Sequence, residues 1–243
     1  MPPGDFTNIF DCQAINMAAV HNGFIQGINA MPTHAPSVPA DKVQAFVIFS
    51  LAAVDNIQHR HDLEEEFMFP EMERKLGKGA LSNNVAQHKE FVPQLIELKQ
   101  YLEDVKSGED EYDGSLLVEK IHSFSDIMID HLNDENLSLE SSRMRAHFTE
   151  KELIDMDAAF MKLALQKINF STTLPLSVVC GNPATPWFPR FPLPLKWATR
   201  WWFARKLSKY SASWEFGPLD LYGNPEHEFH CECYTLSMES FMP

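Results

Sequence analysis

Four of the chain's histidines lie in apolar stripes with the spacing of one helical face, and this pattern constrains the fold more than any other feature. In residues 10–30, His21 continues a row of apolar side chains at steps of three and four. His61, His88 and His131 hold the same place in three further stretches. Burying an unpaired imidazole costs several kcal/mol. Four helices that point these histidines into a common core therefore predict a shared metal site.

Two of these histidines are followed by a carboxylate one helical turn later. Glu65 lies four residues after His61, and Glu135 lies four residues after His131. Side chains at this spacing stack on one helix face. His122 also precedes an acidic residue at this spacing, but it lies nine residues before His131 and so faces away from it. We therefore predict a binuclear site in which one or both glutamates bridge the metal ions.

The periodic stretches predict an all-α fold, an up-down-up-down four-helix bundle followed by a fifth helix. The expected bundle helices are residues 10–30, 41–75, 83–107 and 115–145. Thr149 and Glu152 form a capping-box pattern that begins the fifth helix, which is expected to end near residue 168. The remainder is rich in Pro and Trp and lacks periodicity. We expect a metal-binding bundle in residues 1–148 and, in residues 149–243, a helix with an irregular extension packed on the bundle.

The charge, the apolar runs and the cysteines of the chain indicate which partners it can bind and in which cellular compartment it is expected. The net charge of −14 argues against a nucleic-acid partner, which would require a basic surface. The longest apolar run, near residues 46–54, is too short for a transmembrane helix. The first residues lack the basic and apolar regions of a signal peptide, and four scattered cysteines do not make a disulfide framework. A soluble cytoplasmic protein is the expectation.

Two C-terminal segments allow more than one interpretation. Residues 187–214 are aromatic and basic, which fits a membrane interface, but their prolines favour a cover folded back on the acidic bundle. Such a cover could form a wall of a substrate pocket. Residues 227–233 contain His and Cys side chains, yet Cys-x-Cys is not the usual zinc spacing. An ordinary tail is favoured over a second metal site there.

Residues 10–146 resemble a known family, the hemerythrin-like, or HHE cation-binding, domain. The most specific part is residues 61–70, His-Asp-Leu-Glu-Glu-Glu-Phe-Met-Phe-Pro, with support from Ala-Val-His-Asn around His21 and from the His131/Glu135 pair. The resemblance implies a non-haem centre of two iron ions, favoured over manganese or zinc, that binds or reacts with O₂. The ligands that it implies are His21, His61, Glu65, His88, His131 and Glu135.

One departure from the family bears on function. Oxygen-carrying hemerythrins have two histidines four residues apart on the third helix, whereas the neighbours of His88 at that spacing are Asn84 and Val92. One coordination position is then open, or filled by water or by a spare carboxylate such as Asp62 or Glu64.

An open position disfavours simple O₂ carriage. We therefore expect an O₂-dependent oxidase or oxygenase that acts on a small organic molecule. An O₂- or iron-binding sensor or store without turnover is the alternative, and a zinc or manganese hydrolase is a third. The sequence does not specify the substrate or the oligomeric state.

Overall fold

The structure is a computed structural model that describes residues 1–243 except 183–184, 186, 190, 206–210 and 226–243. The described residues are largely helical, and none of them forms a strand beyond one isolated bridge between Leu219 and Pro225. The predicted all-α class is therefore confirmed. The histidine- and cysteine-containing segment 227–233 lies outside the described residues.

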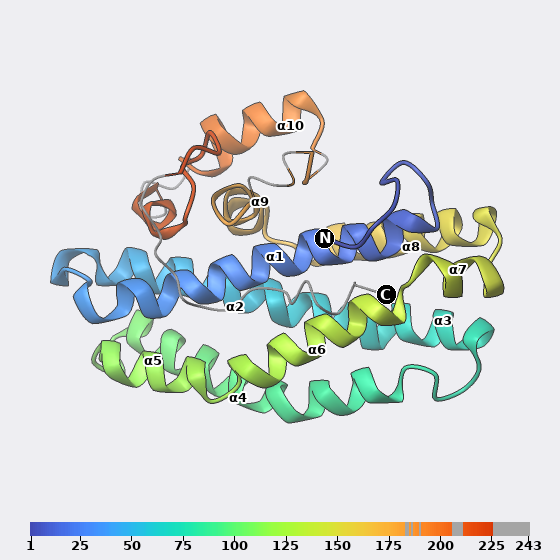
Figure 1. Cartoon of the computed structure of the whole chain (residues 1–243). Coiled ribbons are helices and arrows are strands. Elements are labelled where there is room, and N and C mark those ends of the chain that lie inside the picture. The colour runs from blue at the N-terminus through green and yellow to red at the C-terminus, as the bar shows by residue number, and fades with distance from the viewer. Residues whose placement is uncertain (183–184, 186, 190, 206–210, 226–243) are drawn as a thin grey trace.

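Four long helices form the bundle, as Figure 1 shows. They are α1 (Asp11–His34), α2 (Val43–Leu63), α4 (Ser82–Ser107) and α6 (Ser125–Ser138). Helix α2 packs against α1 and α4, and α6 packs against the same two helices from the other side. A closed ring of four helices results, and its interior is the place where inward-facing side chains from all four can meet.

Shorter helices extend and cover this ring. A π-helical turn, η3 (Glu64–Met68), joins α2 to α3 (Phe69–Leu76) without a break in the helix. The other helices are α5 (Gly114–His122), α7 (Ser141–His147), α8 (Glu150–Lys167), α9 (Phe170–Val179) and α10 (Leu193–Ala198). Brief 3₁₀ or π segments are η1 (Ala35–Ser37), η2 (Ala40–Lys42), η4 (Thr199–Phe203) and η5 (Ala212–Phe216).

The helix boundaries differ from the prediction in two places. Helix α1 continues through Pro32 to His34, because Ile28 and Met31 remain fully buried and their packing offsets the hydrogen bond that proline cannot make. The predicted helix 115–145 is three helices instead. Phe124 leaves helical geometry between α5 and α6 with its ring buried in the core, and Glu140 is extended before α7.

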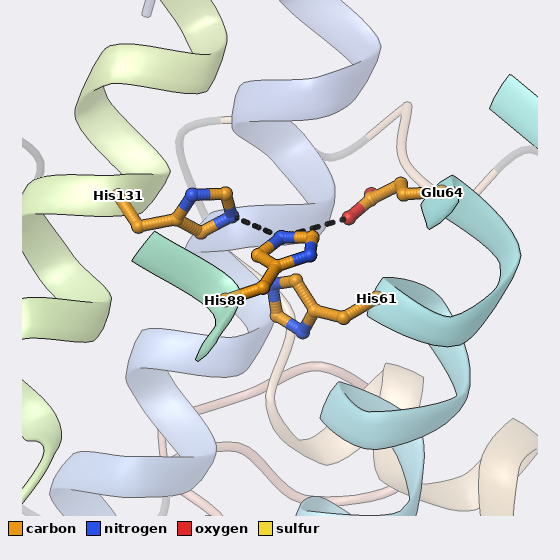
Figure 2. A group of neighbouring side chains, drawn as sticks. All are labelled: His61, Glu64, His88 and His131. Carbon is orange, nitrogen blue, oxygen red and sulfur yellow. Dashed lines mark hydrogen bonds and ion pairs between the residues drawn. The ribbon is translucent and has the colours of Figure 1, made fainter. Parts of the chain in front are cut away.

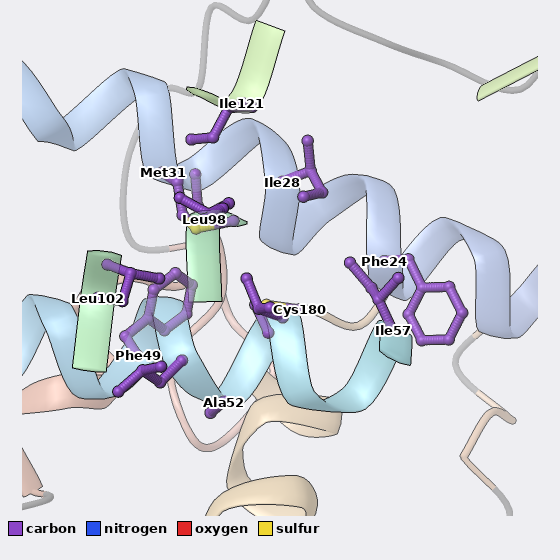
Figure 3. Packing of buried hydrophobic residues seen from close by; sticks show 14 of the residues in the cluster. Phe24, Ile28, Met31, Phe49, Ala52, Ile57, Leu98, Leu102, Ile121 and Cys180 are labelled. Atoms are coloured by element: carbon purple, nitrogen blue, oxygen red, sulfur yellow. The ribbon is translucent and has the colours of Figure 1, made fainter. Parts of the chain in front are cut away.

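The apolar core fills the end of the bundle beside the metal-site residues (Figure 3). Ile28 of α1, Phe49 of α2 and Leu98 of α4 are all fully buried there. Helices α1 and α2 approach closely at Gly27, where a Cβ would lie 3.3 Å from the Cβ of Ala53. Tight packing of this kind fixes the rotation of each helix, and so fixes which residues face the bundle interior.

The segment after α8 folds back on the bundle, but only part of it is a cover. Trp214 is 2% exposed, and the ring centroid of Phe216 lies 4.9 Å from that of Phe46 on α2. In contrast, Trp197, Trp201 and Trp202 are more than half exposed. Trp214 is therefore buried as the predicted cover requires, whereas these three indoles are not.

Four short helical segments, α9, α10, η4 and η5, occur in the described part of the C-terminal extension, where the prolines predicted irregular structure. Asn169 begins α9 because its side chain accepts a hydrogen bond from the backbone N–H of Ser171. The capping box of α8 is present as predicted, with Thr149 and Glu152 bonded reciprocally. Among the described residues, no helix is both long and apolar enough to cross a bilayer.

We expect Phe216→Ala to lower the free energy of unfolding of the whole protein by about 3–5 kcal/mol, because it leaves a cavity against α2. Leu193→Ala is the control, since Leu193 is 73% exposed, and should change it by less than about 0.5 kcal/mol. Urea denaturation of both variants measures the difference. Equal stability of the two variants would mean that the extension is not part of the core.

Candidate metal centre

Histidines from all four bundle helices meet in one buried layer. The ring centroids of His61, His88 and His131 lie 4.4–5.2 Å apart, and the Nε2 atoms of His88 and His131 are 3.0 Å from each other. His21 reaches the group through Glu135, whose Oε2 lies 3.1 Å from His21 Nε2 and 3.7 Å from His131 Nε2. Five of the six predicted ligands therefore lie together in the interior, at most 2% exposed.

The sixth predicted ligand, Glu65, lies at the edge of this group, and its neighbour Glu64 lies inside. Figure 2 shows Glu64 with His61, His88 and His131. One potential ligand atom from each of these four residues lies within 4.8 Å of the others. Glu64 is fully buried, whereas the side chain of Glu65 is 44% exposed and contacts Nδ1 of His88 at 2.9 Å.

Glu64 lies at the junction between helix α2 and the π-helical turn. In η3 the backbone N–H of Phe69 bonds the carbonyl of Glu64, five residues earlier, so this turn contains one more residue than an α-helical turn. The buried carboxylate is also held by an ion pair with Arg60. The Arg60 guanidinium in turn lies 3.0 Å from Met17 Sδ and 4.5 Å from the ring centre of Phe160 on α8.

Sequence reasoning named Glu64 only as a spare ligand because it looked for pairs four residues apart. Residues three apart also share a helix face, and Glu64 stands at that distance from His61. The presence of Arg60 four residues before Glu64 was the second available signal.

Every histidine of the group is oriented by an oxygen atom at Nδ1. Leu132 O accepts from His21 at 3.1 Å, and Ile57 O accepts from His61 at 2.8 Å. A carbonyl oxygen can only accept, so these two rings carry their proton on Nδ1 and leave Nε2 with a free lone pair. Glu65 lies at Nδ1 of His88, and Gln87 Oε1 lies 3.3 Å from Nδ1 of His131. The arrangement is that of metal-binding imidazoles held by a second layer of acceptors.

Five of the atoms that face inward lack hydrogen-bond partners within the described residues. They are Nε2 of His21 and His61, Oε2 of Glu64, and both carboxylate oxygens of Glu135. Buried polar atoms are normally paired, and lone pairs that converge without protons between them repel one another. A cation bonded to these atoms removes both penalties, so the residues present fit a metal site.

Burial sets the charge state that these groups prefer when no cation neutralises them. Desolvation lowers the pKa of His21 to about 3 and lowers the pKa values of His61, His88 and His131 below the usual range. Desolvation also raises the pKa of Glu64 to about 8 and that of Glu135 to about 7. Neutral imidazoles are the form that binds metals. Burial also favours the neutral form of the two carboxyl groups, and a bound metal cation would favour their ionised form.

On the side of α4 that faces the site, His88 is the single histidine. Asn84 is 2% exposed and Val92 is only partly buried, while the ring of Phe91 lies 5.1 Å from that of His61 and 5.5 Å from that of His131. The residue beside His88 on the inner face is therefore Asn84, on the turn before it. His122 is exposed, as predicted.

The chain belongs to the hemerythrin HHE cation-binding domain family, whose model matches residues 16–140. All the residues of the buried group lie inside that match. The chain is also similar to dimeric xanthone biosynthesis cluster protein R11 from Cryptosporiopsis sp. (strain 8999), with 29% identity over 224 residues that cover 87% of this chain and 80% of the relative. No solved structure matches the chain.

We expect the metal-free protein to lose stability as pH rises from about 6.5 to 8. Glu64 up to about pH 8 and Glu135 up to about pH 7 hold protons in the folded state that the unfolded chain has released, because their pKa values are raised to about 8 and about 7. The free energy of unfolding then falls by at most about 1.4 kcal/mol per pH unit for each carboxyl group. The histidines change the free energy of unfolding only at lower pH. Their lowered pKa values make stability rise only up to about pH 6.5, where the unfolded imidazoles lose their protons.

Urea denaturation of the metal-free protein across this range measures the effect. The Glu64→Gln, Glu135→Gln double variant is the control and should show a flatter profile. A wild-type profile without the decline would mean that the two carboxyl groups are not buried as described.

Proposed function

We propose that this protein holds two iron ions between the Nε2 atoms of His21, His61, His88 and His131 and the carboxylates of Glu64 and Glu135. Three observations support this. The inward-facing atoms of His21, His61, Glu64 and Glu135 lack hydrogen-bond partners among the described residues, all four rings are oriented through Nδ1, and the family is a cation-binding one. Imidazole with carboxylate suits iron, and also manganese or zinc.

The chain's own residues would shape such a centre in distinct ways. Glu64 and Glu135 supply the negative charge that offsets the cations, and Arg60 orients Glu64 and favours its ionised form. The rings of Phe24, Phe69 and Phe91 lie against His61 or His88 and exclude water from the interior. Bound iron would supply O₂ binding and electron transfer to it, the chemistry that the side chains themselves lack.

The function that this centre supports best is an O₂-dependent oxidase or oxygenase of a small organic metabolite. The single histidine on the inner face of α4 supports this, because it leaves fewer protein ligands than an oxygen carrier has. The name of the xanthone-cluster relative supports a role in metabolism. Aromatic ketones of the xanthone class are therefore the first substrates to test.

The identity of the helix α2 carboxylate ligand can be tested by metal content. We expect wild-type protein loaded with Fe(II) to hold two irons per chain, as the proposal states. Glu64→Ala should lose stoichiometric iron because it removes a ligand. Glu65→Ala should retain both sites but bind iron about 10–100-fold more weakly, the effect typical of a lost partner of a ligating histidine.

Elemental analysis after dialysis against increasing chelator concentrations measures both effects. His122→Ala is the control and should retain as much iron as wild type. The opposite order, with iron lost from Glu65→Ala and kept by Glu64→Ala, would assign the ligand to Glu65. Zinc retained in preference to iron would contradict the iron assignment.

The reaction with O₂ separates turnover from binding. Iron-loaded, reduced protein is mixed with O₂ while the dissolved O₂ and the optical spectrum are followed with and without added xanthone-class compounds. We expect repeated O₂ consumption that depends on an added compound and is absent from the His61→Ala variant. A spectral change that reverses when O₂ is removed, with no net consumption, would instead indicate the sensor or storage function.

A further inference from the structure

Helix α10 and the π-helical turn η4 expose a row of large apolar side chains that the metal centre does not use. We call this row the Trp face. It consists of Leu193, Trp197, Trp201 and Trp202, which are 73%, 63%, 51% and 58% exposed. Leu193, Trp197 and Trp201 follow one another at steps of four, and the last two indoles stack with centroids 6.4 Å apart. One side of a short helical segment is thus apolar and open to solvent.

Basic side chains flank the Trp face. Lys196 lies beside Trp197 in the sequence, and the Arg205 guanidinium lies 4.5 Å from the ring centre of Trp201. No aspartate or glutamate occurs between residues 171 and 214, although the whole chain has a net charge of −14. A cationic and aromatic surface has therefore been separated from the acidic remainder of the protein.

The Trp face lies on the outermost layer of the molecule. In Figure 1, α10 is separated from the bundle by α9. Helix α9 packs against α2 on one side and against η4 on the other. The apolar face is therefore not a wall of the core, and the acidic bundle lies behind it rather than beside it.

We propose that the Trp face binds the surface of an anionic lipid bilayer. Helices with indole and leucine side chains on one face and Lys or Arg at their flanks lie in the plane of the membrane interface, with the apolar side chains among the acyl chains. The segment 193–203 is too short to span a bilayer, so it docks on the surface. An anionic surface is required because the basic flanks must offset repulsion of the acidic bundle.

A second copy of this chain fits the Trp face less well. In a two-fold symmetric dimer the same patch meets itself, which would bring Lys196, Arg200 and Arg205 of both copies into one interface, to which residues 171–214 contribute no acidic side chain. The charge pattern therefore favours lipid headgroups over self-association.

Co-sedimentation of the full-length protein with vesicles tests the proposal. We expect binding at low salt to vesicles of mixed phosphatidylserine and phosphatidylcholine, weaker binding at high salt, and weak binding to phosphatidylcholine alone. Lipids with brominated acyl chains should quench tryptophan fluorescence in the bound state. Trp197→Ala, Trp201→Ala double substitution should weaken binding by about tenfold or more, because both indoles lose apolar contact.

The matched control is the Ile154→Ala, Met161→Ala double variant, which removes exposed apolar side chains from α8, a helix with more acidic than basic residues. It should bind vesicles like wild type, and the circular dichroism spectra of both double variants should match wild type. Absence of wild-type binding to the anionic vesicles, or equal binding by all three proteins, would overturn the proposal. Self-association that depends on Trp197 and Trp201 without vesicle binding would overturn it too and assign the face to a protein partner.

Discussion

Confining four imidazoles and two carboxyl groups in one water-excluded layer is the constraint on which the rest of the structure depends. Each group would be costly alone, since burial removes its water, and the inward atoms of His21, His61, Glu64 and Glu135 have no hydrogen bond among the described residues. The cost is the same one that shifts the pKa values of the histidines down and those of Glu64 and Glu135 up. A cation at their centre reverses the penalty for all six at once, so metal binding and folding are expected to be coupled.

The surrounding elements hold the six groups in place by separate means. Packing at the other end of the bundle fixes the rotation of the helices, and the acceptors at Nδ1 then fix the rotation of each ring. Among the glutamates of the acidic run, Glu64 enters the interior, because it shares a helix face with His61 three residues earlier and pairs with Arg60. Because Arg60 also lies against Phe160, helix α8 outside the ring is in contact with the side chain that holds a buried carboxylate.

The sequence predicted the class of fold and the four histidines, because both depend on a periodicity of 3.6 residues that the helices keep. It named Glu64 only as a spare ligand, since the prediction followed pairs four residues apart and Glu64 stands three residues after His61. It also did not predict the break at Phe124, where a buried ring outweighs continuous helix. In the extension, charge and prolines led to a predicted cover. Trp214 is buried, but the indoles of Trp197, Trp201 and Trp202 are exposed. Composition does not specify which indole of such a segment contacts the core.

X-ray absorption spectroscopy at the iron edge of the iron-loaded protein tests the central claim most directly. The account predicts a first shell of nitrogen and oxygen only, with the outer scattering pattern of several imidazole rings and a second iron at about 4 Å or less. Sulfur in the first shell, a spectrum without imidazole scattering, or a single isolated iron would contradict it.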